Sequence, residues 1–373
     1  MSGSRSPFGV YVHFPWCRSR CHYCDFAVTT GSIQHESYER AVVEQLKQSR
    51  ESFSDLNLET LYVGGGTPSL WNGSSLGRVV EAICNTFDAE PEEVSLEVNP
   101  SDCSDTNLEA WKKAGVNRLS MGLQSFSSSD LVTLGRSSDM GHSTDSIQRA
   151  LSAGFESLSV DLMLGIPGST HLIENLRKII DLNVPHISVY ELTVEANTRL
   201  AQNVSLGKFV PLDEDALAEQ LLETRRVLAY ESYDHYEVSS FCKGEHVSKH
   251  NMGYWKQHSW LGLGVGATSQ RKNDDSLLRW KNAPTVKSYL SAESKGQRWE
   301  EECLNSKEAQ AEKMWLGLRT NVGIHRKYTV GFESALVKLL AMDLIETLGE
   351  TVVPTPKGLL YSNEITRRVL SCL

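Results

Sequence analysis

Six short apolar runs, rich in β-branched residues, alternate with amphipathic stretches over the first half of the chain. The runs cover residues 9–14, 59–66, 93–98, 118–123, 158–166 and 186–192. The stretches with helical spacing of apolar residues cover 36–53, 74–87, 104–115, 141–154 and 171–182. Strand–helix units of about 30 residues in series predict an α/β fold with a parallel sheet and right-handed crossovers. An open sheet and most of a (β/α) barrel both satisfy this pattern.

The pattern changes after about residue 195. A charged helix is predicted over 213–232, followed by aromatic-rich β structure over 233–241, 250–255 and 260–269. Such a β-rich segment reads as an extension of the first unit rather than as another series of strand–helix units.

The last 70 or so residues read as a compact tail. Helices are predicted over 306–320 and 332–346, and a short hairpin with a final helix within 351–370. Helices followed by a small β wing predict a winged-helix-like unit. Its mixture of acids and bases favours a structural or protein-contact role over DNA binding. The predicted domains are residues 1–225, 226–300 and 301–373.

Composition excludes several classes of function. The net charge of −10 argues against nucleic acid as a main partner, because phosphate binding requires a basic face. No run of about 18 apolar residues predicts a transmembrane segment. The N-terminus has no apolar signal region, and the first predicted strand leaves little room for a transit peptide. Five of the eight cysteines are scattered singly, which is not a disulfide framework and favours a reducing, cytoplasmic location.

Unusual residues recur where the predicted strands end. These are Gly64–Pro68, Glu97–Pro100, Gln124 with Ser125, Asp161, and Gly165–Gly168. In a parallel barrel the carboxyl ends of the strands meet on one face, so these residues predict one shared site at the barrel mouth. A buried carboxylate requires a partner, which for Glu97 and Asp161 is either a ligand or a buried salt bridge.

Three cysteines lie within eight residues after the first predicted strand: Cys17, Cys21 and Cys24, in a C-x3-C-x2-C spacing. Thiolates suit zinc or an iron–sulfur cluster. Structural zinc requires four ligands, and His13 or His22 could supply the fourth. In a [4Fe–4S] cluster, three thiolates hold three irons and leave the fourth iron open to a small ligand. The spacing alone also allows unrelated free thiols.

In context, this spacing resembles the signature of the radical S-adenosylmethionine superfamily. The motifs YVHFPWC, CHYCDF, LYVGGGTPS, LEVNP, RLSMGLQSF, DLMLGIPGST, HISVYELTVE and HNMGYW resemble one branch of it. That branch contains the oxygen-independent coproporphyrinogen III oxidases and the HemW haem chaperones. The resemblance implies a partial (β/α)6 TIM-like barrel that binds a [4Fe–4S] cluster through Cys17, Cys21 and Cys24. It also implies that S-adenosylmethionine chelates the open iron, where an electron can cleave it to a 5′-deoxyadenosyl radical.

The resemblance implies S-adenosylmethionine contacts for a further set of residues. The alternative is core packing for Tyr11 and a solvated loop position for Arg136. Gly65, Gly66 and Thr67 would cradle the amino group, although a glycine turn is often only a tight loop. Arg136 could meet the methionine carboxylate. The full set is Tyr11, Tyr23, Gly65, Gly66, Thr67, Glu97, Gln124, Arg136 and Asp161.

Three features favour the haem chaperone over the oxidase. Phe26 stands where the oxidase pattern has a fourth cysteine, and the oxidase's longer N-terminal extension is absent before Cys17. The HNxxYW motif of HemW-like proteins matches His250–Trp255, where His250 is a candidate haem ligand. An alternative is that these motif residues only shape a loop and fill the core.

We therefore expect a haem chaperone with a [4Fe–4S] cluster, S-adenosylmethionine and haem as cofactors. Its partners would be haem and acceptor apo-haemoproteins, with a flavodoxin or ferredoxin as electron donor if radical chemistry occurs. No catalytic residue is assigned. The alternatives are a decarboxylase of the coproporphyrinogen III oxidase type and a zinc-stabilised, non-catalytic binding protein.

Overall fold

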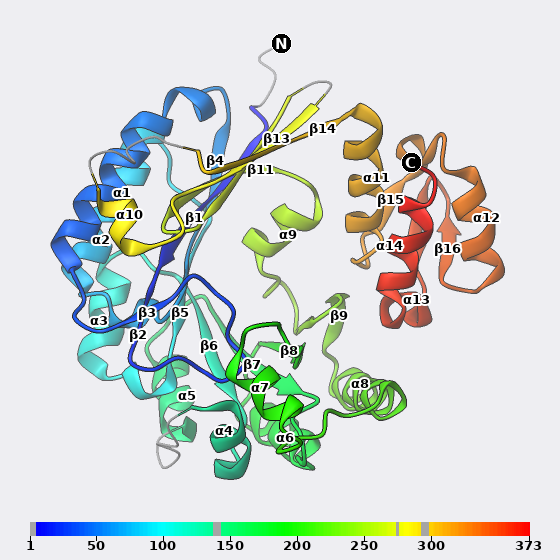
Figure 1. Ribbon diagram of the computed structural model, residues 1–373, viewed down its shortest axis with the longest axis horizontal. Coiled ribbons are helices and arrows are strands. Elements are labelled where there is room, and N and C mark those ends of the chain that lie inside the picture. The colour runs from blue at the N-terminus through cyan, green and yellow to red at the C-terminus, as the bar shows by residue number, and fades with distance from the viewer. Residues whose placement is uncertain (1–4, 137–142, 274–275, 292–297) are drawn as a thin grey trace.

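Six parallel strands form the centre of the molecule, as the alternating sequence pattern predicts (Figure 1). The computed structural model describes residues 5–136, 143–273, 276–291 and 298–373. The six strands are β1 (Pro7–Phe14), β4 (Asn57–Gly65), β5 (Glu93–Val98), β6 (Arg118–Gln124), β7 (Ser157–Leu164) and β8 (His186–Glu191). Each pairs in parallel with the next along the chain, which gives the predicted partial TIM-like barrel.

Helices connect these strands and cover the outer face of the sheet, where the polypeptide must return to start each parallel strand. They are α1 (His35–Ser49), α2 (Gly73–Phe87), α3 (Asp105–Lys113), α4 (Ser128–Leu134), α5 (Ser143–Ser152) and α6 (Leu172–Asp181). The predicted helix over 141–154 begins at Ser143 in the structure, and residues 141–142 lie outside the described residues. In the described part of the chain, no helix is long and apolar enough to cross a membrane.

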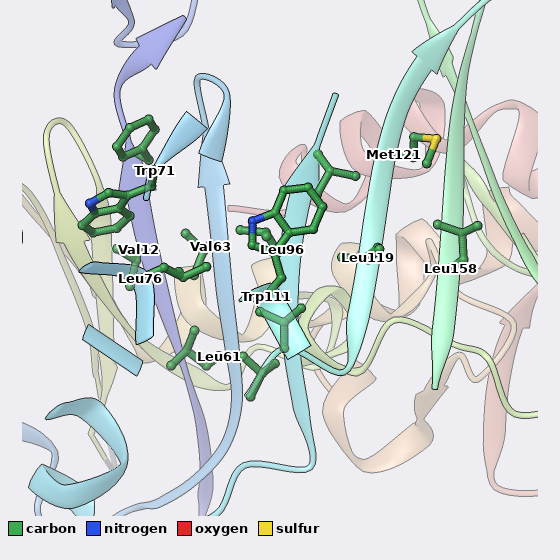
Figure 2. Close-up of a cluster of buried hydrophobic side chains, with 14 of the residues drawn as sticks. Val12, Leu61, Val63, Trp71, Leu76, Leu96, Trp111, Leu119, Met121 and Leu158 are labelled. Atoms are coloured by element: carbon green, nitrogen blue, oxygen red, sulfur yellow. The ribbon is translucent and has the colours of Figure 1, made fainter. Parts of the chain in front are cut away.

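The strands alternate between an apolar outer face and a polar inner face. Val12, Leu61 and Leu96 point outward and pack against Trp71, Leu76 and Trp111, as Figure 2 shows. Burying each such side chain stabilises the fold by roughly 1.5–3 kcal/mol. The inner face instead carries tyrosine, serine, carboxylate and glycine side chains. The period of two along each strand therefore separates the core from the barrel interior.

Residues after the barrel extend its sheet at both edges. β9 (Asp234–Glu237) and β10 (Ser240–Cys242) add antiparallel strands beside β8, after α7 (Arg199–Ser205) and α8 (Glu214–Tyr230). At the other edge, β11 (Ser259–Gly264) pairs in parallel with β1. Three antiparallel strands follow it: β12 (Thr268–Lys272), β13 (Ser276–Lys281) and β14 (Glu300–Asn305), with α10 (Val286–Leu290) between the last two. The predicted domain boundary at residue 225 falls inside α8, and the division into domains stays a prediction.

One secondary-structure prediction in this part is wrong. Residues 250–255 form helix α9 (Lys249–Trp255) rather than β structure. Ser248 caps the helix by accepting a hydrogen bond from the backbone amide of Asn251, and His250 and Tyr254 pair one turn apart. The aromatic residues that suggested a strand are spaced to face the barrel from a helix.

The C-terminal residues pack around a hydrophobic cluster of their own, which includes Met314, Leu339 and Ile365. Their helices are α11 (Ser306–Gly317), α12 (Glu333–Ala341), α13 (Pro356–Leu360) and α14 (Ser362–Leu370), with the 3-10 turn η6 (Arg326–Thr329). Their strands are β15 (Ile324–His325), β16 (Ile345–Leu348) and β17 (Thr351–Pro354).

The helix predicted over 332–346 ends at Ala341, because Ile345–Leu348 pairs with β17 as the first strand of the hairpin. The winged-helix-like assignment stays a prediction.

Candidate cofactor site

A cavity of about 540 Å³ opens at the carboxyl ends of the barrel strands. Its wall contains nearly all the residues that the sequence pattern singled out for the cluster and for S-adenosylmethionine. They are Cys17, Cys21, Cys24, Tyr23, Gly65, Gly66, Thr67, Glu97, Gln124, Arg136 and Asp161. The common strand polarity brings these residues together, although they span 145 positions of the sequence, from Cys17 to Asp161.

The loop with the three cysteines is fixed at its base and its centre. Two short strands, β2 (Trp16–Cys17) and β3 (Thr29–Thr30), pair in parallel and close the loop. At its centre, the backbone amide of His22 donates to the carbonyl of Leu134 over 2.8 Å, and the imidazole Nδ1 lies 3.0 Å from the carbonyl of Thr133. The loop is therefore held against the end of α4.

The donor set of three thiols on one loop at the cavity wall fits an iron–sulfur cluster. The cysteines of a cluster bind different irons, so their sulfurs need not meet at one point. Burial raises the pKa of the Cys17 and Cys24 thiols, so metal binding as thiolates must displace protons.

The glycine loop after β4 approaches the cysteine loop through its backbone. The amide of Gly66 donates to the carbonyl of Phe14 over 2.7 Å, and the amide of Thr67 donates to that of Trp16 over 2.9 Å. A Cβ atom on Gly66 would lie 2.7 Å from the Trp16 carbonyl oxygen. Gly65 has φ of 113°, which favours glycine. Only glycines allow this close contact between the two loops.

Glu97 holds the glycine loop from the neighbouring strand. One carboxylate oxygen accepts from the backbone amide of Gly65 over 2.9 Å, and the other accepts from the Tyr62 hydroxyl over 2.9 Å. Burial raises the pKa of Glu97 to about 7, with a contribution from the nearby charge of Asp161, although both donors oppose the shift. Glu97 therefore exchanges its proton near neutral pH.

Asp161 lines the same cavity as Glu97 and is surrounded by serines. It accepts hydrogen bonds from the hydroxyls of Ser120, at 3.0 Å, and Ser159, at 3.2 Å. Burial raises the pKa of this carboxyl group as well. Neither Glu97 nor Asp161 forms a salt bridge within the described residues, so the salt-bridge alternative is not what the structure shows.

Arg136 is a cation without a carboxylate partner among the described residues. Its Nη2 donates to the carbonyl of Gly122 over 2.8 Å, and its Nη1 donates to the Tyr23 hydroxyl over 3.4 Å. Burial raises the pKa of Tyr23 to about 12, so Tyr23 stays neutral and leaves the charge of Arg136 uncompensated. A guanidinium in this state is suited to bind a carboxylate.

Gln124 supplies an unsatisfied acceptor close to Arg136. Its backbone has φ of 70°, and β6 changes register beside it, between Gly122 and Gln124. Its side-chain oxygen Oε1 is buried without a hydrogen-bond partner in the described structure. A buried polar atom without a partner is costly, and a polar ligand in the cavity would satisfy it.

Two of the predicted contact residues lie away from the cavity wall. Tyr11 lies in the barrel interior, where its hydroxyl is 3.1 Å from His13 Nδ1 and its ring stacks on Tyr62. His250 is 3% exposed and packs near the amino ends of β4 and β5, at the opposite end of the barrel from the cavity. Tyr11 therefore fits its packing alternative.

Both ring nitrogens of His250 are already hydrogen-bonded. Nδ1 lies 2.8 Å from the Thr60 hydroxyl, and Nε2 lies 2.9 Å from the Tyr254 hydroxyl. Burial lowers the pKa of His250 to about 3, so the imidazole is neutral. This placement does not support the predicted role of His250 as a haem ligand, which requires an unpaired nitrogen facing open space.

We expect the substitution His250→Ala to lower stability and to leave the haem affinity of the folded protein unchanged. It removes a buried ring and leaves the Thr60 and Tyr254 hydroxyls unpaired, at a cost of about 2–4 kcal/mol. Denaturant unfolding and haem titration at low temperature measure the two effects. His246→Ala is the control, because His246 is more exposed and makes a weaker 3.2 Å contact with Ser157. Loss of haem affinity at unchanged stability would restore the ligand role.

Sequence reasoning missed three residues that set the electrostatics of the site. Tyr62 holds Glu97, and Ser120 and Ser159 hold Asp161. The alternation of side chains along the strands could have predicted their position. Each of these residues lies two positions from a glycine or carboxylate on the same strand, and residues two apart on a strand share a face.

A cysteine loop and a glycine-rich loop at the mouth of a partial (β/α) barrel define the class of the radical S-adenosylmethionine proteins. The family model of the Radical SAM superfamily matches residues 11–188. Members of this superfamily bind a [4Fe–4S] cluster and S-adenosylmethionine, and the residues described above fit both groups.

Comparison with known proteins identifies the family within this superfamily. The chain is 32% identical to the heme chaperone HemW of Lactococcus lactis, over 98% of each chain. It is 31% identical to the mouse protein named radical S-adenosyl methionine domain-containing protein 1, mitochondrial, over 88% of this chain and 76% of the relative. The chain therefore belongs to the HemW family of radical S-adenosylmethionine proteins.

A solved structure supports the fold. Coproporphyrinogen III oxidase (HemN) from Escherichia coli, a radical SAM enzyme, superposes with a TM-score of 0.81, over 99% of this chain and 91% of the enzyme, at 22% sequence identity. At this identity the likeness establishes the shared α/β architecture.

Proposed function

We propose that this protein is a haem chaperone that binds haem and delivers it to acceptor haemoproteins. The observation that carries the proposal is the match to chaperones of the HemW family over almost the whole length of the chain. A local feature agrees with it. Phe26, which replaces the fourth cysteine of the oxidase pattern, lies at the cavity wall and is 58% exposed. The oxidase and zinc-protein alternatives are not favoured.

In the proposed cofactor site, the three cysteines hold a [4Fe–4S] cluster and the rest of the cavity binds S-adenosylmethionine. When bound, the cluster supplies one electron for reductive cleavage of S-adenosylmethionine. Arg136 would bind the methionine carboxylate, and the backbone of the Gly65–Thr67 loop would receive the amino group. Glu97 and Asp161 would accept hydrogen bonds from ribose hydroxyls or face the cationic sulfur. Gln124 would gain a partner for its unsatisfied oxygen.

Titration of Glu97 predicts that S-adenosylmethionine binds more tightly as the pH rises from 6 to 8. With a pKa of about 7, roughly one-tenth of Glu97 is ionised at pH 6 and nine-tenths at pH 8. A ligand that requires the carboxylate should therefore gain about five- to tenfold in affinity over this range. Equilibrium dialysis with the cluster-loaded protein measures the change.

The substitution Glu97→Gln should remove this pH-dependent gain relative to wild type. Glu195→Gln is the matched control, because Glu195 also lines the cavity but is exposed, and this variant should keep the gain. An unaltered pH profile in Glu97→Gln would show that Glu97 does not bind the ligand in its ionised form.

The function is tested by haem titration followed by transfer, with and without the reconstituted cluster. We expect saturable haem binding and reconstitution of an apo-haemoprotein from the haem-loaded protein. The reduced, cluster-loaded protein should form no protoporphyrinogen IX from coproporphyrinogen III and S-adenosylmethionine. Formation of that product would replace the chaperone proposal with the oxidase. Haem that binds but never leaves for an acceptor would also contradict the proposal.

The proposed partners are haem and acceptor haemoproteins. A flavodoxin or ferredoxin would serve as electron donor where cleavage of S-adenosylmethionine takes place. A reducing compartment such as the cytosol suits an assembly of thiolate ligands, which is the basis of the proposed cytoplasmic location.

A further inference from the structure

Four lysines gather where the barrel sheet meets the C-terminal residues. Lys256 follows α9, Lys272 ends β12, Lys313 lies in α11 and Lys327 lies in η6. The ammonium nitrogens of Lys313 and Lys327 lie 4.1 and 4.9 Å from the centre of the Tyr328 ring. The ammonium groups of Lys272 and Lys313 lie close enough for each to shift the pKa of the other. None of these residues lines the cofactor cavity.

The charges of these lysines are not compensated within the described residues. None of the four forms an ion pair there, although the chain has 47 acidic residues and 37 basic ones. Glu312, next to Lys313 in sequence, instead pairs with Arg279 and accepts a hydrogen bond from Gln257. Glu59 lies 3.9 Å from Nδ1 of His258, whose pKa the lysines lower. Asp274 and Asp275 lie outside the described residues.

Burial and neighbouring charges both shift the pKa values of this cluster. Burial lowers the pKa of Lys272, and the charge of Lys313 lowers it further. Burial also lowers the pKa of Lys313; the contact with Lys272 raises it, and the charge of Lys327 lowers it. The pKa of His258 falls to about 4 through burial and then through Lys256, Lys313 and Lys272. Cation–π contacts with Tyr328 offset part of the repulsion, but an anion would offset more.

We propose that Lys256, Lys272, Lys313 and Lys327 form a binding site for a ligand that presents two or more anionic oxygens. Each ammonium group has three donors and no acceptor, so an oxyanion between Lys272 and Lys313 can accept from both. Two of the lysines belong to the barrel sheet and its neighbouring helix, and two belong to the C-terminal residues. A bound anion therefore joins these two parts of the molecule. The ligand's oxygens come from a phosphate compound or from the carboxylates of a porphyrin.

Pyrophosphate is the first probe, measured by isothermal titration and thermal unfolding at constant ionic strength. We expect wild type to bind it and to unfold at a higher temperature with it. The double variant Lys272→Met with Lys313→Met should lose at least about tenfold in affinity, since it removes two charged donors. Lys338→Met is the control, because Lys338 is exposed on α12 outside the cluster, and this variant should bind as wild type.

The unfolding temperatures of wild type and the double variant without pyrophosphate show whether the lysines bind a ligand or stabilise the fold. Removing like charges should leave the unfolding temperature of the double variant equal to or above that of wild type. A clear decrease would show that the lysines stabilise the fold, and would overturn the proposal. Equal pyrophosphate affinity in wild type and double variant would overturn it too.

A second pair of probes distinguishes the two sources of anionic oxygens. Iron-free protoporphyrin IX carries two carboxylates, and its dimethyl ester carries none. Binding of the free acid that depends on Lys272 and Lys313, with weak binding of the ester, assigns the site to porphyrin carboxylates. Binding of pyrophosphate alone assigns it to a phosphate compound. If neither probe binds in a lysine-dependent way, the site does not exist.

Discussion

Replacing any one of Cys17, Cys21 and Cys24 with serine should reduce the iron content of the anaerobically reconstituted protein from about four atoms to below about one per chain. Each cysteine is expected to be the sole protein ligand of one iron. A serine hydroxyl is a much poorer ligand for iron than a thiolate. The loop is fixed at β2 and β3 and at His22, so it cannot readily offer another ligand.

Iron and sulfide analysis, together with absorption near roughly 400 nm, measures this effect. The matched control is Cys303→Ser, because Cys303 is exposed on β14 and does not line the cavity. The control should keep its full iron content and colour. Stoichiometric zinc in place of iron in the wild-type protein would contradict the cluster assignment and favour the zinc alternative.

The substitution Gly65→Ala should weaken S-adenosylmethionine binding by at least about tenfold and destabilise the fold. Alanine at φ of 113° is strained by roughly 1–3 kcal/mol, and its Cβ would lie 2.5 Å from the His13 ring. That ring cannot easily move, because it lies 3.1 Å from the Tyr11 hydroxyl and 3.0 Å from the Ala27 carbonyl. The loop must shift instead, which breaks the hydrogen bond from the Gly65 amide to Glu97.

The substitution Gly31→Ala is the control that introduces the same backbone strain without a steric clash. Gly31 has a similar φ of 118°, and no atom lies within 4 Å of the position of its added Cβ. This variant should lose stability by the strain alone and should bind S-adenosylmethionine within about twofold of wild type. Equilibrium dialysis and denaturant unfolding compare the two variants. Equal behaviour of both would show that the contact between His13 and the glycine loop does not control binding.

The strands of the barrel and the position of the cofactor cavity follow from local features of the sequence. Runs of β-branched residues predict short strands. Parallel strands in a barrel place their carboxyl ends on one face. Cys17, Gly65, Glu97 and Asp161 could therefore be assigned to one cavity from their positions at strand ends. Tyr62, which hydrogen-bonds Glu97, follows from the same alternation but carries no motif.

The segment around His250 shows where such reasoning fails. Its composition of aromatic residues favours a strand, and the motif suggests an accessible histidine. The structure instead forms α9, which packs beneath the barrel and pairs both ring nitrogens with Thr60 and Tyr254. Thr60 lies 190 positions away in the sequence, so no local pattern could reveal this contact.

The sequence by itself determined the six strand–helix units and the cysteine spacing, because both depend on residues close together along the chain. Only the tertiary structure decided which buried polar groups have a hydrogen-bond partner. Among the described residues, it gives His250 two hydrogen bonds and leaves the side-chain oxygen of Gln124 without any. Burial and partners are set by distant segments, and they fix the charge and reactivity of a side chain.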